Sequence, residues 1–252
     1  MNKKIINAFG KTDVGMMRTI NQDSIFLSSE PVGHLNNLFI VADGMGGHKA
    51  GDVASRIAIE KFVQFVKDTE TTDPASILDE GIVSINKEIY ELATSNKDYD
   101  GMGTTFVVTT INDNHVYIAN VGDSRLYLVN KEIQQITRDH SLVEEMVRMG
   151  MIDKQQARTH YKKNVITKAI GVAEDKIATP DIFEIEIEPG DLLLLCSDGL
   201  TNMVEDYDIK KIIRTSEDIE EAVERLIDQA NDNGGKDNIS AILIEPEIID
   251  EV

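Results

Sequence analysis

Residues 104–129, with the sequence TTFVVTTINDNHVYIANVGDSRLYLV, contain three apolar runs separated by short polar turns. The runs cover residues 104–111, 115–121 and 126–129, and the Asn112-Asp113-Asn114 segment between the first two has the composition of a hairpin turn. Short runs rich in Val, Ile, Thr and Tyr are typical of β-strands. The stretch therefore predicts an antiparallel meander in the middle of the chain.

The rest of the chain combines strand patterns with helix patterns. We expect further strands at residues 5–9, 25–27, 38–42, 182–187, 192–196 and 239–244. Apolar residues recur every three or four positions, as in amphipathic helices, at residues 54–66, 77–92 and 219–230. This order is unlike the regular strand-helix alternation of a parallel α/β sheet. It predicts an α+β fold in which sheets pack together and helices lie outside them.

Residues 141–171 follow a weaker pattern. Ser141 and Glu144 have the spacing of a capping box and predict a helix that ends near Gly150. A local excess of basic residues follows, at Lys154, Arg158, Lys162, Lys163 and Lys168. In an acidic protein such a stretch is typical of an exposed flap. Because the sequence has no linker, repeat or low-complexity segment, we predict one domain over residues 1–252 with a flap at about 141–171.

The chain is strongly acidic. Its 252 residues include 25 Lys and Arg against 45 Asp and Glu, which gives a formal net charge of -20. Such a charge repels nucleic acid and anionic membrane surfaces. Cys196 is the one cysteine, which fits a reducing compartment, and no apolar run approaches the roughly 20 residues of a membrane helix. We therefore expect a cytoplasmic protein that neither binds nucleic acid nor inserts into a membrane.

Four aspartates share a position at the junction of an apolar run and a loop: Asp43, Asp123, Asp198 and Asp237. Carboxylates gathered at strand ends repel one another strongly at low dielectric, and cations can neutralise such a cluster. Ligands that are all oxygen favour Mg²⁺ or Mn²⁺. The pattern predicts a metal site, although each Asp-Gly pair taken alone is also a common turn.

A site with two divalent ions can activate a water at neutral pH and hold a phosphoryl group in line. Asp43 is the best candidate for a carboxylate that bridges the ions, because the glycine after it leaves the Gly44 carbonyl free as another hard ligand. Asp198 and Asp237 would then hold the second ion.

Arg18 precedes Asn21-Gln22-Asp23 at the start of the second predicted strand. A guanidinium can hold two oxygens of a phosphate monoester, although an exposed arginine in a loop is the simpler interpretation. Asp23 is open to three interpretations: it could bind a water at the site, orient Arg18, or cap the strand.

Other catalytic patterns fit the sequence poorly. The run of glycines after Asp43 lacks the Gly-Lys-Ser/Thr ending of a phosphate-binding P-loop. Cys196 follows four leucines and has Asn202 where a thiol phosphatase carries arginine, so we expect an inert core residue. The histidines near these motifs, His48, His140 and His160, lack the spacing of a metalloprotease helix.

Taken together, these residues resemble the motifs of the metal-dependent serine/threonine protein phosphatases of type 2C, in the compact bacterial branch. The resemblance spans residues 12–244. It rests on seven motifs that occur in order: Arg18 with Asn21-Gln22-Asp23, Val41-Ala42-Asp43-Gly44-Met45-Gly46-Gly47-His48, Gly103-Thr104-Thr105, Asn120-Val121-Gly122-Asp123-Ser124-Arg125, Asp139-His140-Ser141, Cys196-Ser197-Asp198-Gly199-Leu200 and Lys236-Asp237-Asn238.

The resemblance implies a central β-sandwich of two mostly antiparallel sheets flanked by helix pairs, with a binuclear Mn²⁺ or Mg²⁺ centre at one end. In that arrangement Asp43 bridges both ions, the Gly44 carbonyl is a ligand, and Asp198 and Asp237 complete the set. Arg18 would hold the substrate phosphate. Asp123, with Asp198, matches a third and weaker metal site, and residues 141–171 match the family's mobile flap.

Two positions depart from the family pattern. Gln22 stands where many members carry glutamate, so it and Asp23 would contact water at the metals with one charge fewer. Met45 stands where eukaryotic members place a histidine proposed as general acid, although methionine is usual in bacterial members. We therefore assign no general acid.

The expected function is hydrolysis of phosphoserine and phosphothreonine on proteins by direct attack of an activated water. The expected partners are phosphoproteins, including a cognate serine/threonine kinase and its substrates, and the expected state is a monomer. A phosphatase-like binding module without chemistry is opposed by the intact Asp43, Asp198, Asp237 and Arg18. An enzyme for a small phosphoester stays open, because the chemistry would be identical.

Overall fold

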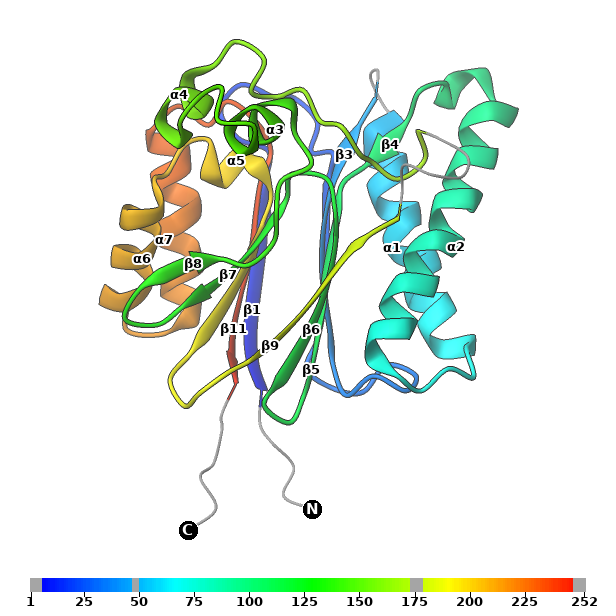
Figure 1. Cartoon of the computed structure of the whole chain (residues 1–252), viewed down its shortest axis with the longest axis horizontal. Coiled ribbons are helices and arrows are strands. Elements are labelled where there is room, and N and C mark those ends of the chain that lie inside the picture. The colour runs from blue at the N-terminus through cyan, green and yellow to red at the C-terminus, as the bar shows by residue number, and fades with distance from the viewer. Residues whose placement is uncertain (1–5, 47–49, 173–178, 247–252) are drawn as a thin grey trace.

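The computed structural model describes residues 6–46, 50–172 and 179–246. Two antiparallel sheets face each other at the centre of the molecule (Figure 1). The first sheet has the order β1 (Ile6–Asp13), β11 (Ile239–Pro246), β10 (Leu192–Cys196), β7 (Arg125–Val129) and β8 (Ile133–Gln135). The second has the order β2 (Asp23–Ser28), β3 (Leu38–Met45), β5 (Phe106–Asn112), β6 (His115–Val121) and β9 (Asp181–Glu186), and β4 (Gly103–Thr104) pairs with β3.

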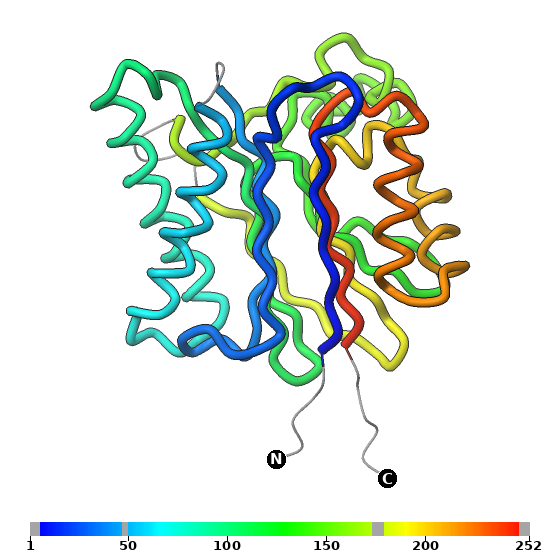
Figure 2. The backbone as a smooth tube through the Cα atoms, turned by 180° about the vertical axis from the view of Figure 1, so that it is seen from behind, coloured from blue at the N-terminus to red at the C-terminus, as the bar shows by residue number. Residues whose placement is uncertain are grey.

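Helix pairs cover the outer face of each sheet, so the molecule has four layers (Figures 1 and 2). The helices α1 (Ala50–Asp68) and α2 (Pro74–Ser95) lie on the second sheet, and α6 (Asp206–Thr215) and α7 (Ile219–Asp232) lie on the first. Local sequence sets the helix starts, because the Asp73 and Asp218 side chains accept backbone N–H groups of the first turns of α2 and α7. The sequence prediction of an α+β sandwich with outer helices is therefore confirmed.

Three apolar layers hold these elements together. One lies between the α1–α2 pair and its sheet, one between the two sheets, and one between the other sheet and the α6–α7 pair. Phe62, Ile242 and Leu226 are fully buried representatives of the three layers. Each such side chain contributes roughly 1.5–3 kcal/mol by its removal from water. Within the described ranges, no helix has the length and apolar character that crossing a lipid bilayer requires.

The elements near one end of the sandwich are short. After β10 comes the one-turn helix α5 (Asp198–Thr201), and the predicted flap contains α3 (Leu142–Arg148) and α4 (Lys154–Thr159). The Ser141 side chain accepts the Glu144 N–H at 3.3 Å, which is one of the two bonds of the capping box that the spacing predicts. The 3₁₀ turn η1 (Lys97–Tyr99) follows α2.

Several boundaries differ from the sequence expectation. β3 continues to Met45 rather than stopping at residue 42, because Gly44 and Met45 pair with β4. The predicted turn between β5 and β6 is confirmed, and Asp113 there has the left-handed φ of 55° that such turns favour. The predicted three-strand meander is wrong at β7, because the chain crosses to the other sheet after β6 and β7 pairs with β10 and β8. The helix α6 was not predicted, although Ile209, Ile212 and Ile213 have helical spacing.

Candidate metal and phosphate site

The predicted acidic residues meet at one end of the sandwich. Asp23 and Asp43 are directly opposed in the β2–β3 register, Asp198 begins α5, and Asp237 precedes β11. Burial raises the pKa of Asp43 well above its usual range, and the charges of Asp23, Asp198, Asp123 and Asp237 raise it further. Five carboxylates separated by long stretches of sequence therefore lie within electrostatic reach of one another.

The backbone of Asp43 is held by the neighbouring strand. The Asp43 N–H donates to Thr105 Oγ1 at 3.0 Å, and the Asp43 carbonyl accepts the Thr105 N–H and the Thr104 hydroxyl, each at 2.9 Å. These bonds fix the backbone at the end of β3, and they use no oxygen of the Asp43 carboxylate.

Asp23 is held by two hydroxyl groups. Ser197 Oγ and Ser240 Oγ donate to Asp23 Oδ2 at 2.8 and 2.7 Å, while the buried Oδ1 has no hydrogen-bond partner among the described residues. Burial raises the pKa of Asp23 to about 7, and the nearby Asp198 and Asp237 charges add to this shift. An unsatisfied buried carboxylate oxygen beside other acids is costly unless a ligand completes it.

Asp198 has a similar arrangement. Asn202 Nδ2 donates to Asp198 Oδ2 at 2.8 Å, and the buried Asp198 Oδ1 accepts no hydrogen bond within the described part of the chain. Burial and the Asp237 charge raise the pKa of Asp198 to about 6. The site therefore contains a second buried oxygen that a cation could engage.

Arg18 lies against Asp237. Its Nη2 donates to Asp237 Oδ2 at 2.8 Å, and half of the Arg18 side chain is exposed. Asn238 shapes the loop that carries Arg18, because its Nδ2 donates to the Val14 and Ile20 carbonyls at 2.9 and 3.0 Å. The segment at residues 234–238 thus places the predicted phosphate-binding cation beside a predicted metal ligand.

Gly44 lies where no side chain would fit. A Cβ there would stand 2.0 Å from the Gly51 carbonyl oxygen, and the Gly44 N–H donates to the Gln22 carbonyl at 3.1 Å. The Gln22 side chain lies against Gly51, where a Cβ would meet its Nε2 at 2.5 Å. Close packing of the β3 end against the start of α1 therefore requires glycine, and it places Gln22 next to the predicted carbonyl ligand.

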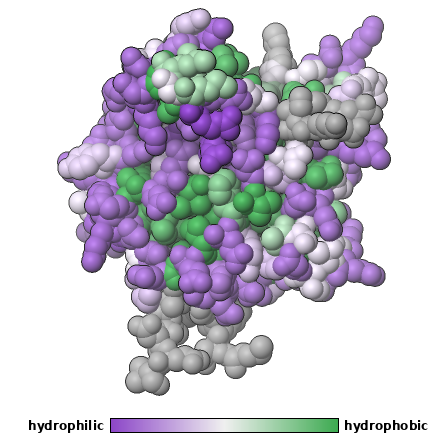
Figure 3. Space-filling view, viewed as in Figure 1, coloured by the Kyte–Doolittle hydropathy of each residue, from purple (hydrophilic) through white to green (hydrophobic). Residues whose placement is uncertain are grey.

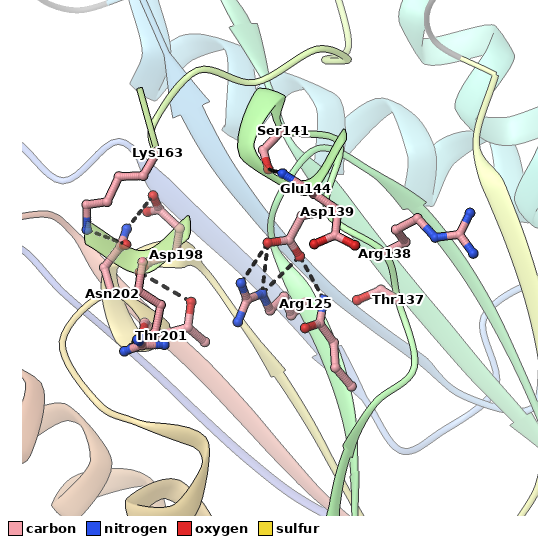
Figure 4. A network of polar contacts seen from close by, with 12 residues as sticks. Arg125, Thr137, Arg138, Asp139, Ser141, Glu144, Lys163, Asp198, Thr201 and Asn202 are labelled. Atoms are coloured by element: carbon pink, nitrogen blue, oxygen red, sulfur yellow. Dashed lines mark hydrogen bonds and ion pairs between the residues drawn. The ribbon is translucent and has the colours of Figure 1, made fainter. Parts of the chain in front are cut away.

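Asp123 occupies the turn between β6 and β7. Gly122 before it has a φ of 109°, which favours glycine, and its N–H donates to His140 Nδ1 at 3.0 Å. Burial raises the pKa of Asp123 well above its usual range, with Asp198 as the next largest cause. Asp123 and Asp198 also line a cavity of about 510 Å³ beneath the flap, part of whose polar lining appears in Figure 4.

The donor set fits divalent cations in charge and in chemistry. The acids provide hard oxygens, two of these oxygens are buried without partners, and burial together with the neighbouring acids raises the pKa values of Asp23 and Asp198. Among the described residues, no three His, Cys, Asp or Glu side chains are arranged so that together they could already hold a metal ion. Asp237 forms an ion pair with Arg18 instead, so a metal ion that binds this carboxylate would replace the arginine.

Comparison with known proteins identifies the family. Residues 18–239 match the family model for protein phosphatase 2C. The chain belongs to the protein phosphatase 2C family. The serine/threonine phosphatase stp of Listeria innocua is 41% identical over 246 residues, which cover 95% of each chain. The chain is therefore a metal-dependent serine/threonine phosphatase, as the resemblance implied.

Solved structures support the same assignment. Stp1 from Staphylococcus aureus superimposes with a TM-score of 0.89 and 37% identity, covering 96% of the phosphatase and 95% of Stp1. The catalytic domain of PstP, solved in complex with 2 manganese ions, superimposes with a TM-score of 0.84 and 31% identity, covering 97% and 99% of the two chains. The α+β fold class is thus shared with known phosphatases.

Sequence reasoning missed the neutral groups that hold the acids. Both could have been found in the sequence, because Ser240 is a polar residue inside an apolar strand and Asn202 lies four positions, about one helical turn, after Asp198. Cys196 is fully buried in β10, and burial raises the pKa of its thiol to about 12, as expected of an inert core residue. His48 lies outside the described residues.

Proposed function

We propose that this phosphatase hydrolyses phosphoserine and phosphothreonine on proteins at a two-metal site formed by Asp43, the Gly44 carbonyl, Asp198 and Asp237. The observation that supports this most directly is the cluster of buried acids, with two oxygens lacking partners, beside the half-exposed Arg18. The metals, when bound, supply a water of lowered pKa and neutralise charge on the phosphoryl group.

Arg18 binds the substrate in this proposal. A cation at Asp237 would displace Arg18 Nη2 from that carboxylate, and the planar fork of Arg18 would then be free to donate to two phosphate oxygens. The half-exposed side chain can turn toward an incoming phosphoryl group at small cost in desolvation. Substrate binding and metal binding at Asp237 therefore support each other.

Asp23 orients the attacking water. The Ser197 and Ser240 hydroxyls occupy its Oδ2, so Oδ1 is the oxygen that accepts a hydrogen bond from water at the site. In the metal-free site burial raises the pKa of this carboxyl group to about 7, and bound cations would favour the ionised form that accepts the hydrogen bond. Gln22, which lies against Gly51, assists as a neutral polar group.

A protein substrate fits the surface of the flap. Met149 and Met151 are 61% and 65% exposed, and Figure 3 shows apolar atoms over the flap above a band of hydrophilic side chains. Exposed apolar side chains on the flap favour contacts with a polypeptide over contacts with a small phosphoester. We propose that residues 1–252 form one catalytic domain and that residues 141–171 act as its flap.

Finer assignments extend the same proposal. Mn²⁺ is the preferred ion, Mg²⁺ is the alternative, and Asp123 with Asp198 holds a third, weaker ion in the cavity beneath the flap. The substrates include a cognate serine/threonine kinase and the proteins that it phosphorylates. A monomeric state and a cytoplasmic location stay predictions.

One assay tests the proposal. Turnover of a phosphothreonine peptide is measured with Mn²⁺ and with EDTA, for the wild type beside Asp198→Ala. We expect turnover that requires Mn²⁺ and is lost in Asp198→Ala. A chelated wild type that retains full activity, or an active Asp198→Ala variant, would contradict the two-metal site.

A further inference from the structure

Asn202 connects the flap with a carboxylate of the candidate metal site. It directly follows α5, so it lies one helical turn beyond Asp198. Its Nδ2 donates to Asp198 Oδ2 at 2.8 Å, and its backbone N–H donates to the Asp198 carbonyl at 2.7 Å. The two bonds restrain both the side chain and the backbone of Asp198.

Lys163 of the flap fixes the orientation of the Asn202 amide. Its Nζ donates to Asn202 Oδ1 at 2.7 Å, and the three side chains form a chain of contacts from the flap to the site (Figure 4). An ammonium group can donate but not accept, and a carboxylate can accept but not donate. The amide must therefore turn its oxygen to Lys163 and its nitrogen to Asp198.

Arg158 fastens the flap to the same region. Its Nη2 donates to the Thr201 carbonyl at 3.1 Å, and its Nε pairs with Glu205 at 2.9 Å. Thr201 and Glu205 stand on either side of Asn202 in the sequence. Two flap cations thus contact the segment that carries Asn202, so a displacement of the flap removes Lys163 from the amide.

We infer that Asn202 is a positioning residue for Asp198 and that Lys163 extends this control to the flap. The inference rests on the proposed function, because it takes Asp198 as a metal ligand. Asn202 occupies Oδ2 and restrains rotation of the carboxylate, which leaves the buried Oδ1 in a fixed place. Flap position and metal affinity are therefore coupled through a single amide side chain.

Calorimetric Mn²⁺ titration tests the coupling with Asn202→Ala, Lys163→Met and the double variant. Partners that orient metal ligands typically change metal affinity 10- to 100-fold, so we expect a loss of at least about 10-fold in Asn202→Ala. Lys163→Met should weaken binding in the same direction, and the double variant should match Asn202→Ala alone. At saturating Mn²⁺ the kcat of Asn202→Ala should recover, with KM for a phosphothreonine peptide near the wild-type value.

Matched variants separate positioning from other effects. Asn233 Nδ2 donates to the Met203 carbonyl at 2.7 Å, so Asn233→Ala loosens the same loop without releasing Asp198. Lys162 Nζ lies 5.6 Å from the Tyr161 ring centroid, so Lys162→Met removes a flap charge without touching Asn202. Both variants should bind Mn²⁺ like the wild type, and thermal unfolding in EDTA checks that each variant folds.

Three results would overturn the inference: wild-type affinity in Asn202→Ala, equal losses in Asn233→Ala and Asn202→Ala, or tighter binding in Lys163→Met. The last result would mean that Lys163 acts through its charge alone. If Asn202→Ala fails to fold, the Mn²⁺ affinities of Lys163→Met and Lys162→Met are compared instead. Weaker binding in Lys163→Met alone would support the inference, and equal affinities would overturn it. Asp198→Asn is titrated in parallel, because unchanged Mn²⁺ binding there would contradict the proposed metal site rather than the role of Asn202.

Discussion

Replacing Arg18 with alanine tests how the phosphatase holds a phosphoryl group. Arg18 makes one 2.8 Å contact with Asp237, and half of its side chain is exposed, so the fold loses little when it is removed. Hydrogen bonds from a charged donor contribute about 1.5–3 kcal/mol, which corresponds to a rise of roughly 10- to 150-fold in KM for a phosphothreonine peptide.

Metal affinity responds differently to the same change. Arg18 competes with a cation for Asp237, but an exposed ion pair contributes only about 0–1 kcal/mol. Arg18→Ala should therefore leave Mn²⁺ affinity unchanged or tighten it by less than about 5-fold. Initial-rate kinetics and calorimetry measure the two quantities separately.

Two control variants accompany Arg18→Ala. Arg18→Lys should rescue KM in part, because an ammonium brings the charge without the planar fork. Arg56→Ala removes an arginine of similar exposure that pairs with Glu60 on α1, and it should leave KM unchanged. Inorganic phosphate should inhibit Arg18→Ala more weakly than the wild type. Wild-type kinetics and wild-type phosphate inhibition in Arg18→Ala would refute the assignment, and the metals alone would then have to hold the phosphate.

The remaining predictions concern metal, charge and pH. Exhaustive chelation should abolish turnover, and added Mn²⁺ should restore it at least as well as Mg²⁺; activity that survives chelation would contradict this. Thiol alkylation should have no effect on turnover, because Cys196 is buried. Asp43→Asn or Asp237→Asn should abolish turnover with the fold intact, while Asp123→Ala should lower turnover without loss of tight metal binding; calorimetry that shows equal losses in Asp123→Ala and Asp43→Asn would refute the separate roles. In EDTA, Asp23, whose pKa is raised to about 7, should stabilise the fold at low pH and lose this contribution as pH rises through 7. The difference in Tm between the wild type and Asp23→Asn is measured from pH 5.5 to 8. Both proteins contain His140, whose lowered pKa makes stability rise with pH, so the difference removes its effect. A difference in Tm that does not vary with pH would contradict the role of Asp23.

The parts of the fold that repeat a simple period could be predicted from the sequence. Short runs rich in Val, Ile, Thr and Tyr predicted the β5–β6 hairpin, and helical spacing predicted α1, α2 and α7. The third strand of the predicted meander was wrong, because β7 pairs with β10 and β8 in the other sheet. Short or tertiary elements could not be predicted, because β8 has three residues and the end of β3 depends on pairing with β4. The helix α6 is the exception, since its isoleucines carried a detectable period within a charged segment.

The residues of the candidate site likewise fall into those that the sequence predicts and those that it does not. The acids could be predicted because Asp43, Asp123 and Asp198 end apolar runs and Asp237 comes just before one. Their long-range hydrogen-bond partners could not, because these contacts join distant parts of the chain: Ser240 reaches Asp23 across 217 positions, and Arg18 reaches Asp237 across 219. Asn202, four positions after Asp198, is the local exception among the partners described above. A pattern confined to a few residues does not encode the long-range pairs, and they depend on the strand order of the two sheets.

These partners also explain how the site keeps its negative charge. Asp23 is held by two serine hydroxyls and Asp198 by an amide, and these neutral donors orient the carboxylates without neutralising them. Lys163 is held one side chain away from Asp198 by the same amide. Arg18 does contact an acid of the site directly, but through a half-exposed pair that a divalent cation can displace at a cost of about 0–1 kcal/mol. The buried acids therefore lower their mutual repulsion by binding metal or by taking up protons, and the balance between these two outcomes is set by pH and metal concentration.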